Sequence, residues 1–303
     1  MICIDKNKVL DKGTAAALGV FDGLHLGHQK VLGGALAAAE ELGCAPAVFT
    51  FRSGSVTSKD IAGTLITEAD KLKMLGGMGF GYALTADFAE LKDMSAEDFV
   101  KQVLKGRLNT RCVVCGEDFR FGRGGAGDVN ALREICGGLG IEVRAVKKLS
   151  LGGAEVSSTR IRALIERGEI AAANELLGRR YGYTIKVEHG AQLGRTWDFP
   201  TINQPLPEGL VLPRFGVYAA KVLVDGEWLA GVTNIGVKPT VSKSAPPLAE
   251  TFIIGCHEDL YGKALPIELY EFVRPERVFA NFGELRDEIA RNTEQVKEYF
   301  KHS

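Results

Sequence analysis

Two histidines lie three residues apart in the glycine-punctuated segment GVFDGLHLGHQ, residues 19–29. An apolar run ends as this segment starts, and a helical pattern begins near Gly27 and His28. The first turn of a helix leaves backbone N–H groups without partners and carries the positive end of the helix dipole, so it favours an anion. His25 and His28 could both face one phosphate there and donate to the charge that develops during group transfer. The alternative is a pair of surface histidines at a helix cap, but two of the five histidines share this one turn.

Hydroxyl groups and an arginine open a second helical segment, VSSTRIR, residues 156–162. Its two serines are of the type that caps helices. Hydroxyls, backbone amides and one guanidinium that converge from this element would stabilise negative charge spreading over phosphates. An ordinary helix cap explains the same residues equally well.

Short apolar runs alternate with helical patterns over roughly the first 178 residues. This alternation is typical of βαβ units and predicts an α/β, Rossmann-like domain with a parallel sheet covered on both faces. The expected strands cover residues 14–21, 45–51, 111–116 and 141–149. The expected helices cover residues 28–43, 68–77, 96–105, 128–140 and, as one helix or a broken pair, 156–178.

Short β-rich runs broken by glycine and proline follow Arg179. Their spacing predicts a small antiparallel β-barrel, in which Asp225 and Gly226 form a hairpin turn. An amphipathic helix over residues 283–300 ends the chain. We therefore expect two domains, residues 1–180 and 181–303.

The composition is that of a folded chain with no bulk charge. Of the 303 residues, 46% are hydrophobic and 25% are charged, and the formal net charge is −1. Such a chain has no field that draws it to nucleic acid or to an anionic membrane, so neither is expected as a partner. No apolar run approaches the roughly 18 residues of a membrane span, and the first residues carry several charges, which favours a cytoplasmic location.

Cys112 and Cys115 form a CxxC motif inside an apparent buried strand. An offset of three residues sends their side chains to opposite faces of a sheet, and no second CxxC is present to complete a zinc site. Plain core packing is therefore the favoured interpretation over a redox or metal function.

The glycine-rich motifs of the first half resemble a known family. GVFDGLHLGH, GEDFRFGRGGAGD (116–128) and VSSTRIR are similar, in this order, to the FMN adenylyltransferase half of the bacterial bifunctional riboflavin kinase/FMN adenylyltransferases, also called FAD synthetases. The resemblance implies that His25 and His28 are catalytic and contact the phosphates of ATP, and that Asp118 and Phe119 bind flavin. The further ATP-binding residues that it implies in this half are Gly19, Phe21, Asp22, Gly27, Ser157, Ser158, Thr159 and Arg160. The plainer alternative for Asp22 is an aspartate that stabilises a turn. For Asp118 and Phe119 it is a pair of residues at the end of a strand.

The second half carries motifs that resemble the riboflavin kinase half of the same family. HGAQLGRTWDFPTIN (189–203) is similar to its glycine-containing ATP loop followed by FPTAN, which implies ATP binding at Gly190 and Gly194 and Mg²⁺ binding at Thr201 and Asn203. Glu250 matches the proposed general base, and Arg274 is a candidate contact for phosphate or flavin. Taken alone, the segment with Thr201 and Asn203 would be a strand-turn element. Glu250 would be a solvated glutamate on a strand, and Arg274 would be a surface arginine.

Together the two motif sets predict a bifunctional transferase. Riboflavin would be phosphorylated by ATP to FMN, and FMN would then be joined to AMP from ATP to give FAD and pyrophosphate, with Mg²⁺ as the cofactor. One alternative is a riboflavin kinase whose N-terminal domain binds flavin nucleotides weakly or for regulation, because residues 49–55 read FTFRSGS where the family commonly has a Pro-His-Pro run. A relative of class I aminoacyl-tRNA ligases would need a basic face or an anticodon-binding domain, and the sequence indicates neither.

Overall fold

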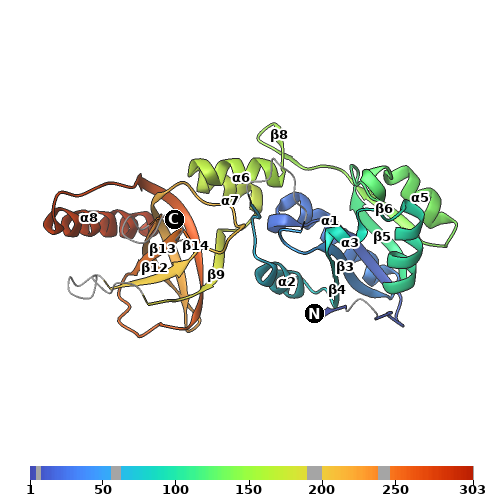
Figure 1. The fold of residues 1–303 in the computed structure, drawn as a ribbon, viewed down its shortest axis with the longest axis horizontal. Coiled ribbons are helices and arrows are strands. Elements are labelled where there is room, and N and C mark those ends of the chain that lie inside the picture. Colours follow the sequence, from blue (N-terminus) through green and yellow to red (C-terminus); the bar gives the residue numbers. More distant parts are fainter. Residues whose placement is uncertain (5–7, 56–62, 190–199, 238–245, 303) are drawn as a thin grey trace. The chain divides into compact units, whose positions relative to one another are not determined.

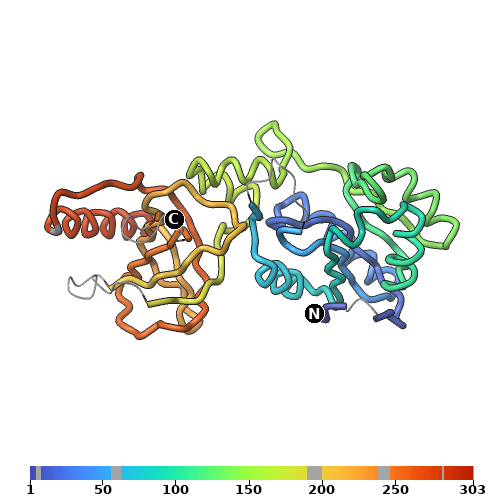
Figure 2. Tube along the Cα trace, in the orientation of Figure 1, coloured from blue at the N-terminus to red at the C-terminus, as the bar shows by residue number. Residues whose placement is uncertain are grey.

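The chain folds into two units, shown as a ribbon in Figure 1 and as a tube in Figure 2. The computed structural model describes residues 1–4, 8–55, 63–189, 200–237 and 246–302. The first unit comprises Met1–Ser158 and the second Thr159–Ser303. Each unit is described by itself below.

The first unit is built on a six-stranded sheet with the order β1-β4-β3-β2-β5-β6, in which every pairing is parallel. This confirms the predicted parallel sheet, although the sequence had not indicated β4. The strands are β1 (Ile2–Cys3), β2 (Thr14–Leu18), β3 (Ala45–Phe51), β4 (Tyr82–Ala86), β5 (Thr110–Gly116) and β6 (Glu142–Val146). A separate hairpin joins β7 (Ser150–Leu151) to β8 (Ala154–Glu155).

Helices cover both faces of this sheet (Figure 1). Ala15 and Ala17 of β2 pack with α1 and α2 in one core cluster, whereas Ala16 and Leu18 pack with the π-helix η2 and α5 in another. Period-two alternation along a strand requires this division. The helices of the first unit are η1 (Asp22–Leu24), α1 (Leu26–Glu41), α2 (Glu68–Gly77), α3 (Phe88–Leu91), α4 (Ala96–Asp98), η2 (Phe99–Arg107), η3 (Arg123–Gly125) and α5 (Val129–Gly137).

Side-chain caps fix where several of these helices begin. Thr67 Oγ1 accepts a hydrogen bond from Asp70 N at the start of α2, and Asp128 Oδ1 accepts from Asn130 N and Ala131 N at the start of α5. Such caps satisfy backbone donors that the first helical turn leaves unpaired. The segment expected as an α-helix over residues 96–105 instead becomes a π-helix after its first turn.

The two cysteines of the CxxC motif lie in different core clusters, as their offset predicted. Cys112 packs with α1 on one face of β5, and Cys115 packs with α5 on the other. Both are fully buried, and this burial raises the pKa of each thiol to about 11. The thiols are therefore protonated at neutral pH and pack as core side chains.

The second unit is a six-stranded antiparallel sheet with the order β10-β13-β12-β11-β14-β9. The sheet curls until its edge strands approach, and a bridge between Glu188 and Asn203 joins them. This arrangement agrees with the predicted small barrel. The strands are β9 (Tyr181–Lys186), β10 (Thr201–Pro205), β11 (Gly216–Val224), β12 (Glu227–Gly236), β13 (Leu248–Ile253) and β14 (Ala264–Pro275).

The expected Asp-Gly turn joins β11 to β12. Asp225 and Gly226 have φ angles of 46° and 94°. A two-residue type I′ hairpin turn requires positive φ at both of its central residues.

Three helices accompany the sheet of the second unit: α6 (Ser158–Arg167), which begins at the unit boundary, α7 (Ile170–Leu177) and α8 (Phe282–Lys301). Val296 of α8 packs on Val217, Ala219 and Val232, so α8 covers the outer face of the curled sheet. The segment 156–178 is thus the broken pair of helices that the sequence left open.

The two units meet at residues 158 and 159, whereas the sequence placed the boundary near 180. Helix α7 accounts for the difference. Asn174 Nδ2 donates to Leu269 O, and Asn174 Oδ1 accepts from Tyr181 N, so α7 is bonded to β14 and to the start of β9. None of the helices in the described part of the chain has the length and apolar composition that crossing a bilayer requires.

Candidate active sites

The loop between β2 and α1 is held in a tight left-handed conformation. Phe21, Gly23 and Leu24 have φ angles of 53°, 81° and 49°. A Cβ at Gly23 would lie 2.7 Å from the Leu65 side chain, so glycine is needed there for space as well as for its backbone angle. Asp22 Oδ1 accepts a hydrogen bond of 2.8 Å from Leu65 N, which ties the loop to the segment before α2.

The two predicted histidines stack at the start of α1. His25 is the N-cap, and its Nδ1 accepts a hydrogen bond of 3.3 Å from His28 N. An Nδ1 that accepts carries no proton, so the proton of the neutral His25 ring is on Nε2, which is a donor. The ring centroids are 3.6 Å apart with 17° between the planes, and Phe21 meets His28 edge-on at 5.4 Å. A Cβ at Gly27 would lie 3.1 Å from Cε1 of His25, so a larger residue there would press on that ring.

Both imidazoles are neutral at physiological pH. Burial lowers the pKa of His25 to about 4, and burial together with the neighbouring His25 lowers the pKa of His28 well below its ordinary value. His28 Nδ1 is buried without a hydrogen-bond partner in the described part of the chain. The pair therefore offers hydrogen bonds to a ligand, and not a positive charge.

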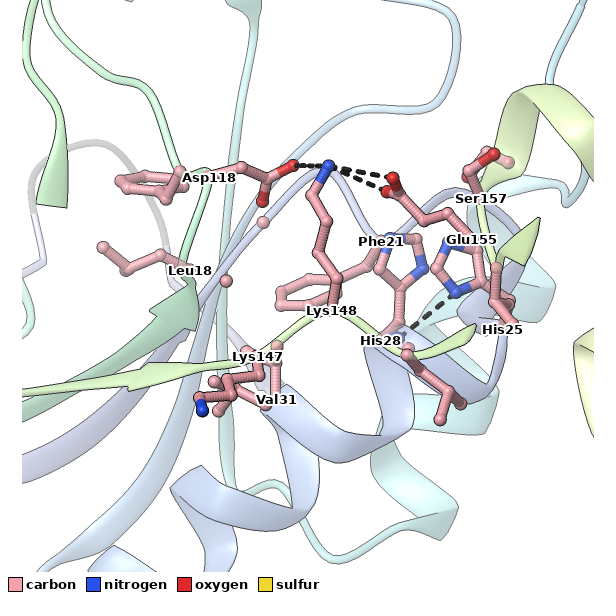
Figure 3. A pocket seen from close by; sticks show the side chains of 18 residues that line it. Leu18, Phe21, His25, His28, Val31, Asp118, Lys147, Lys148, Glu155 and Ser157 are labelled. Atoms are coloured by element: carbon pink, nitrogen blue, oxygen red, sulfur yellow. Dashed lines mark hydrogen bonds and ion pairs between the residues drawn. The ribbon is translucent and has the colours of Figure 1, made fainter. Parts of the chain in front are cut away.

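The histidines open into a cavity of about 280 Å³ at the carboxyl ends of β2 and β5 (Figure 3). Ligands of parallel α/β sheets commonly bind at this edge. The predicted residues that line the cavity are Gly19, Phe21, His25, Gly27, His28, Asp118, Phe119, Ser157 and Ser158. The sequence had placed these residues in three separate motifs, and the fold brings them together.

Three other predicted ATP-binding residues do not line this cavity. Asp22 is buried, its carboxylate bonds to Leu65 N, and its carbonyl accepts from Ser158 Oγ at 2.9 Å. Thr159 and Arg160 follow on α6 and belong to the second unit. Their roles stay predictions.

Apart from Asp118, sequence reasoning missed the charged residues that line the cavity. Lys147 and Lys148 directly follow β6, and Glu155 is the last residue of β8 in the hairpin that comes next. Lys148 Nζ lies 2.9 Å from Asp118 Oδ2 and 2.9 Å from Glu155 Oε1. The sequence signal for this cluster was the pair of lysines directly after the predicted strand that becomes β6. Because β6 is the neighbour of β5 in the sheet, the ends of the two strands lie side by side.

In the second unit, predicted kinase residues fall in one row across the sheet. Asn203 lies opposite Glu250, Glu250 opposite Asn234, Asn234 opposite Val217, and Val217 opposite Arg274. Residues directly opposite each other in antiparallel strands point to the same face. Asn203, Glu250 and Arg274 therefore share the face that α8 covers, and Asn234 joins them as a residue that the sequence did not single out.

Arg274 ends this row in a network of charged side chains with α8. Its Nε lies 3.1 Å from Glu288 Oε1 and donates to Asn292 Oδ1 at 3.0 Å. Arg277 and Arg291 contact the other oxygen of Glu288 at 3.6 and 2.5 Å. Glu288 and Asn292 are buried, so the helix holds the guanidinium of Arg274 in a fixed place.

Thr201 lies on β10 two residues before Asn203, which puts both side chains on one face of the strand. The predicted ATP-binding residues Gly190 and Gly194 lie outside the described residues.

Comparison with known families agrees with this division of the chain. The FAD synthetase family matches residues 7–160, and the riboflavin kinase family matches residues 177–300. The bifunctional riboflavin kinase/FMN adenylyltransferase of Bacillus subtilis is 37% identical over 294 residues, which cover 94% of this chain and 92% of the relative. The enzyme of the same description from Escherichia coli K12 is 33% identical, with 95% of this chain and 93% of the relative covered.

The chain belongs to the bifunctional riboflavin kinase/FMN adenylyltransferase family.

A solved structure shares the fold of this family member along its whole length. It is a crystal structure described as a macrolide-efflux protein from Streptococcus pneumoniae, with a TM-score of 0.86, 25% identity and 98% of each chain covered. That description applies to the Streptococcus protein, and we take from it the fold alone. The two family matches leave residues between 160 and 177 unassigned, so the functional boundary near 180 stays a prediction.

Proposed function

We infer that this protein makes FAD from riboflavin in two steps, each in its own unit. The riboflavin kinase unit transfers the γ-phosphate of ATP to riboflavin, and the adenylyltransferase unit joins FMN to AMP from a second ATP with release of pyrophosphate. One observation supports this function: residues of each motif set lie close together in the fold. The histidine pair lines the cavity of the first unit, and Asn203 pairs with Glu250 in the second.

In the adenylyltransferase unit, a phosphate oxygen of FMN would attack the α-phosphorus of ATP and expel pyrophosphate. No covalent enzyme intermediate is needed, because the unit can hold both phosphates in line. His25 Nε2–H, His28 and the N–H groups at the start of α1 would donate to the oxygens on which charge develops. A neutral imidazole keeps one N–H, so it can donate to this charge without a change in its own protonation state.

In the kinase unit, Glu250 is our candidate for the general base. Its carboxylate would take the proton from the 5′-hydroxyl of riboflavin as that oxygen attacks the γ-phosphorus of ATP. Glu250 is half-buried and lies between Asn203 and Asn234 in the sheet. Two amide side chains beside it can position a hydroxyl and a phosphate without competing for the proton.

The residues of β10 fit a magnesium ion that arrives with ATP. Thr201 and Asn203 offer a hydroxyl and an amide oxygen on one face, and oxygen atoms are the ligands that Mg²⁺ prefers. The described residues contain no group of three or more His, Cys, Asp or Glu that could hold a metal. A site that relies on the phosphates for most of its ligands agrees with that finding, and the ion would neutralise the phosphate charge during transfer.

The alternative of a kinase with a merely regulatory first unit is not favoured. The FAD synthetase family covers that unit, and the predicted phosphate-binding residues His25, His28, Ser157 and Ser158 line a single cavity there. The loop FTFRSGS is also well anchored, because Ser53 N donates to Glu68 Oε2 and Lys71 Nζ donates to Phe51 O. Since both steps consume ATP, we include a cytoplasmic location in the proposal.

Single substitutions test the two-site assignment. His28→Ala should abolish FAD formation from FMN and ATP and leave FMN formation from riboflavin intact. Glu250→Ala should abolish FMN formation and leave FAD formation from added FMN intact. Chromatographic separation of the products measures both reactions in each variant. Loss of both activities in either variant, with the circular dichroism spectrum retained, would refute the assignment.

A further inference from the structure

We propose that Lys148 is the cationic residue that binds the phosphates of ATP in the adenylyltransferase cavity, and that Glu155 competes with those phosphates for it. The proposal rests on the function proposed above and adds to it a binding residue and a residue that opposes binding.

The first argument is the position of Lys148. It follows β6, lines the cavity with both histidines, and extends between Asp118 and Glu155 (Figure 3). Its backbone N–H donates to Glu117 Oε1 at 2.9 Å, so the base of the side chain is fixed. The Lys148 side chain is 40% exposed, so an incoming ligand can reach it from solvent.

The second argument is the balance of charge. A triphosphate carries several negative charges, and the stacked imidazoles are neutral at physiological pH. Among the residues that line the cavity, the cations are Lys147 and Lys148. In Figure 3 the Lys147 side chain lies beside Val31, apart from the imidazoles, whereas Lys148 approaches Glu155, which lies next to the histidine pair. Lys148 is therefore the lysine placed to neutralise a phosphate that the histidines bind.

The third argument is that the present partners of Lys148 can be exchanged. The side chains of Asp118 and Glu155 are 59% and 47% exposed. Exposed ion pairs contribute little to stability, so the ammonium can leave them for a phosphate that bears more charge. In Figure 3 Glu155 lies next to the histidine pair, so its negative charge is close to the proposed phosphate site. Glu155 therefore opposes an incoming triphosphate both by holding Lys148 and by direct repulsion.

Substitutions at the two ends of this ion pair should have opposite effects. In FAD formation from FMN, Lys148→Met should raise the KM for ATP about tenfold, which is the effect of losing one charge-assisted hydrogen bond, and Lys148→Arg should restore most of the affinity. Glu155→Gln should lower the KM for ATP by about threefold, because it leaves the ammonium with Asp118 alone of these two carboxylate partners and removes a negative charge from the cavity. The KM for FMN should change little in all three variants.

The opposite signs separate this role from a structural one. If Lys148 only braces the loops after β5 and β6, then Lys148→Met and Glu155→Gln break the same ion pair and should weaken ATP binding alike. That result, or an unchanged KM in Lys148→Met, would overturn the proposal. The matched control is Lys101→Met with Glu97→Gln, an exposed pair at 2.6 Å outside the cavity, which should leave the KM for ATP unchanged.

A binding measurement distinguishes a failure of this proposal from a failure of the proposed function. Calorimetric titration of the full chain with Mg²⁺-pyrophosphate needs no turnover, and the affinity should fall in Lys148→Met and rise in Glu155→Gln. Wild-type protein that makes no FAD but shows these shifts would refute the adenylyltransferase function and retain the phosphate site. Equal pyrophosphate affinity in the wild type and both variants would refute the role of Lys148.

Discussion

At the scale of single residues, burial decides how the two histidines act. An exposed imidazole is partly charged near neutral pH, whereas His25 and His28 are stacked inside the cavity and stay neutral. The hydrogen bond from His28 N fixes the tautomer of His25, so its remaining N–H points away from the helix cap. A neutral pair with fixed donors leaves the charge of the cavity to lysine, aspartate and glutamate side chains.

The buried state of His25 should make the stability of the first unit depend on pH. The pKa of His25 falls from an ordinary value of 6.5 to about 4 on folding, so protons favour the unfolded chain. The stabilising contribution is complete above pH 6.5 and is lost as the pH falls towards 4, by up to about 3 kcal/mol. His25→Asn removes the titrating ring and keeps an oxygen that can cap α1.

Urea unfolding between pH 7.5 and pH 4.5 measures this effect. The free energy of unfolding of the wild type should fall more steeply with decreasing pH than that of His25→Asn. Both tryptophans, Trp197 and Trp228, belong to the second unit, so fluorescence follows that unit alone, and a change in circular dichroism without a change in fluorescence is assigned to the first unit. Parallel pH curves for the two proteins would contradict the buried neutral state.

At the scale of elements, strand pairing assembles the sites. Asn203, Glu250 and Arg274 come from three strands that are distant in sequence, and antiparallel register places them in one row. In the first unit, β2 and β5 bring the histidine loop next to Asp118 and Phe119 at one sheet edge. The hairpin between β11 and β12 fixes the register on which the row of the second unit depends.

The Asp225–Gly226 turn should therefore be sensitive to a β-carbon at Gly226. This glycine has a φ of 94°, and the space around it is open, so Gly226→Ala introduces backbone strain without a clash. We expect a loss of about 1 kcal/mol in the stability of the second unit, and less than about 0.5 kcal/mol for the matched variant Asp225→Asn, because asparagine tolerates positive φ. Thermal unfolding followed by tryptophan fluorescence checks both values; equal stability of the two variants would contradict the assigned turn.

Local patterns predicted most elements, and long-range pairing accounts for what they missed. The strand over residues 45–51 and the helix over residues 68–77 were predicted at their observed bounds, because apolar periodicity and flanking polar residues mark them. Strand β4 was missed, because its pairing with β3 marks it as a strand and the local sequence pattern does not. The Lys148 ion pairs were missed for the same reason: they depend on the neighbouring ends of β5 and β6.

At the scale of the whole molecule, the two proposed sites explain how a chain with a net charge of −1 can bind ATP in each of its units. In the proposed function, local groups would bind the phosphates, namely helix N–H groups, neutral imidazoles and a few cations. Nothing in this design requires a uniformly basic surface. In this proposed function, FMN is the product of the kinase unit and the substrate of the adenylyltransferase unit.

Separate sites predict that two inactive variants should complement each other. His28→Ala keeps the kinase unit and Glu250→Ala keeps the adenylyltransferase unit, so an equimolar mixture should convert riboflavin and ATP into FAD although neither variant alone does so. FMN released by the first variant must diffuse to the second, so FAD should appear after a lag, and added FMN should remove that lag. Adding a flavin-binding protein that captures free FMN should suppress FAD formation in the mixture. A mixture in which FMN stays bound to the His28→Ala protein and no FAD forms, while Glu250→Ala still converts added FMN, would show instead that the kinase unit does not release FMN to solution.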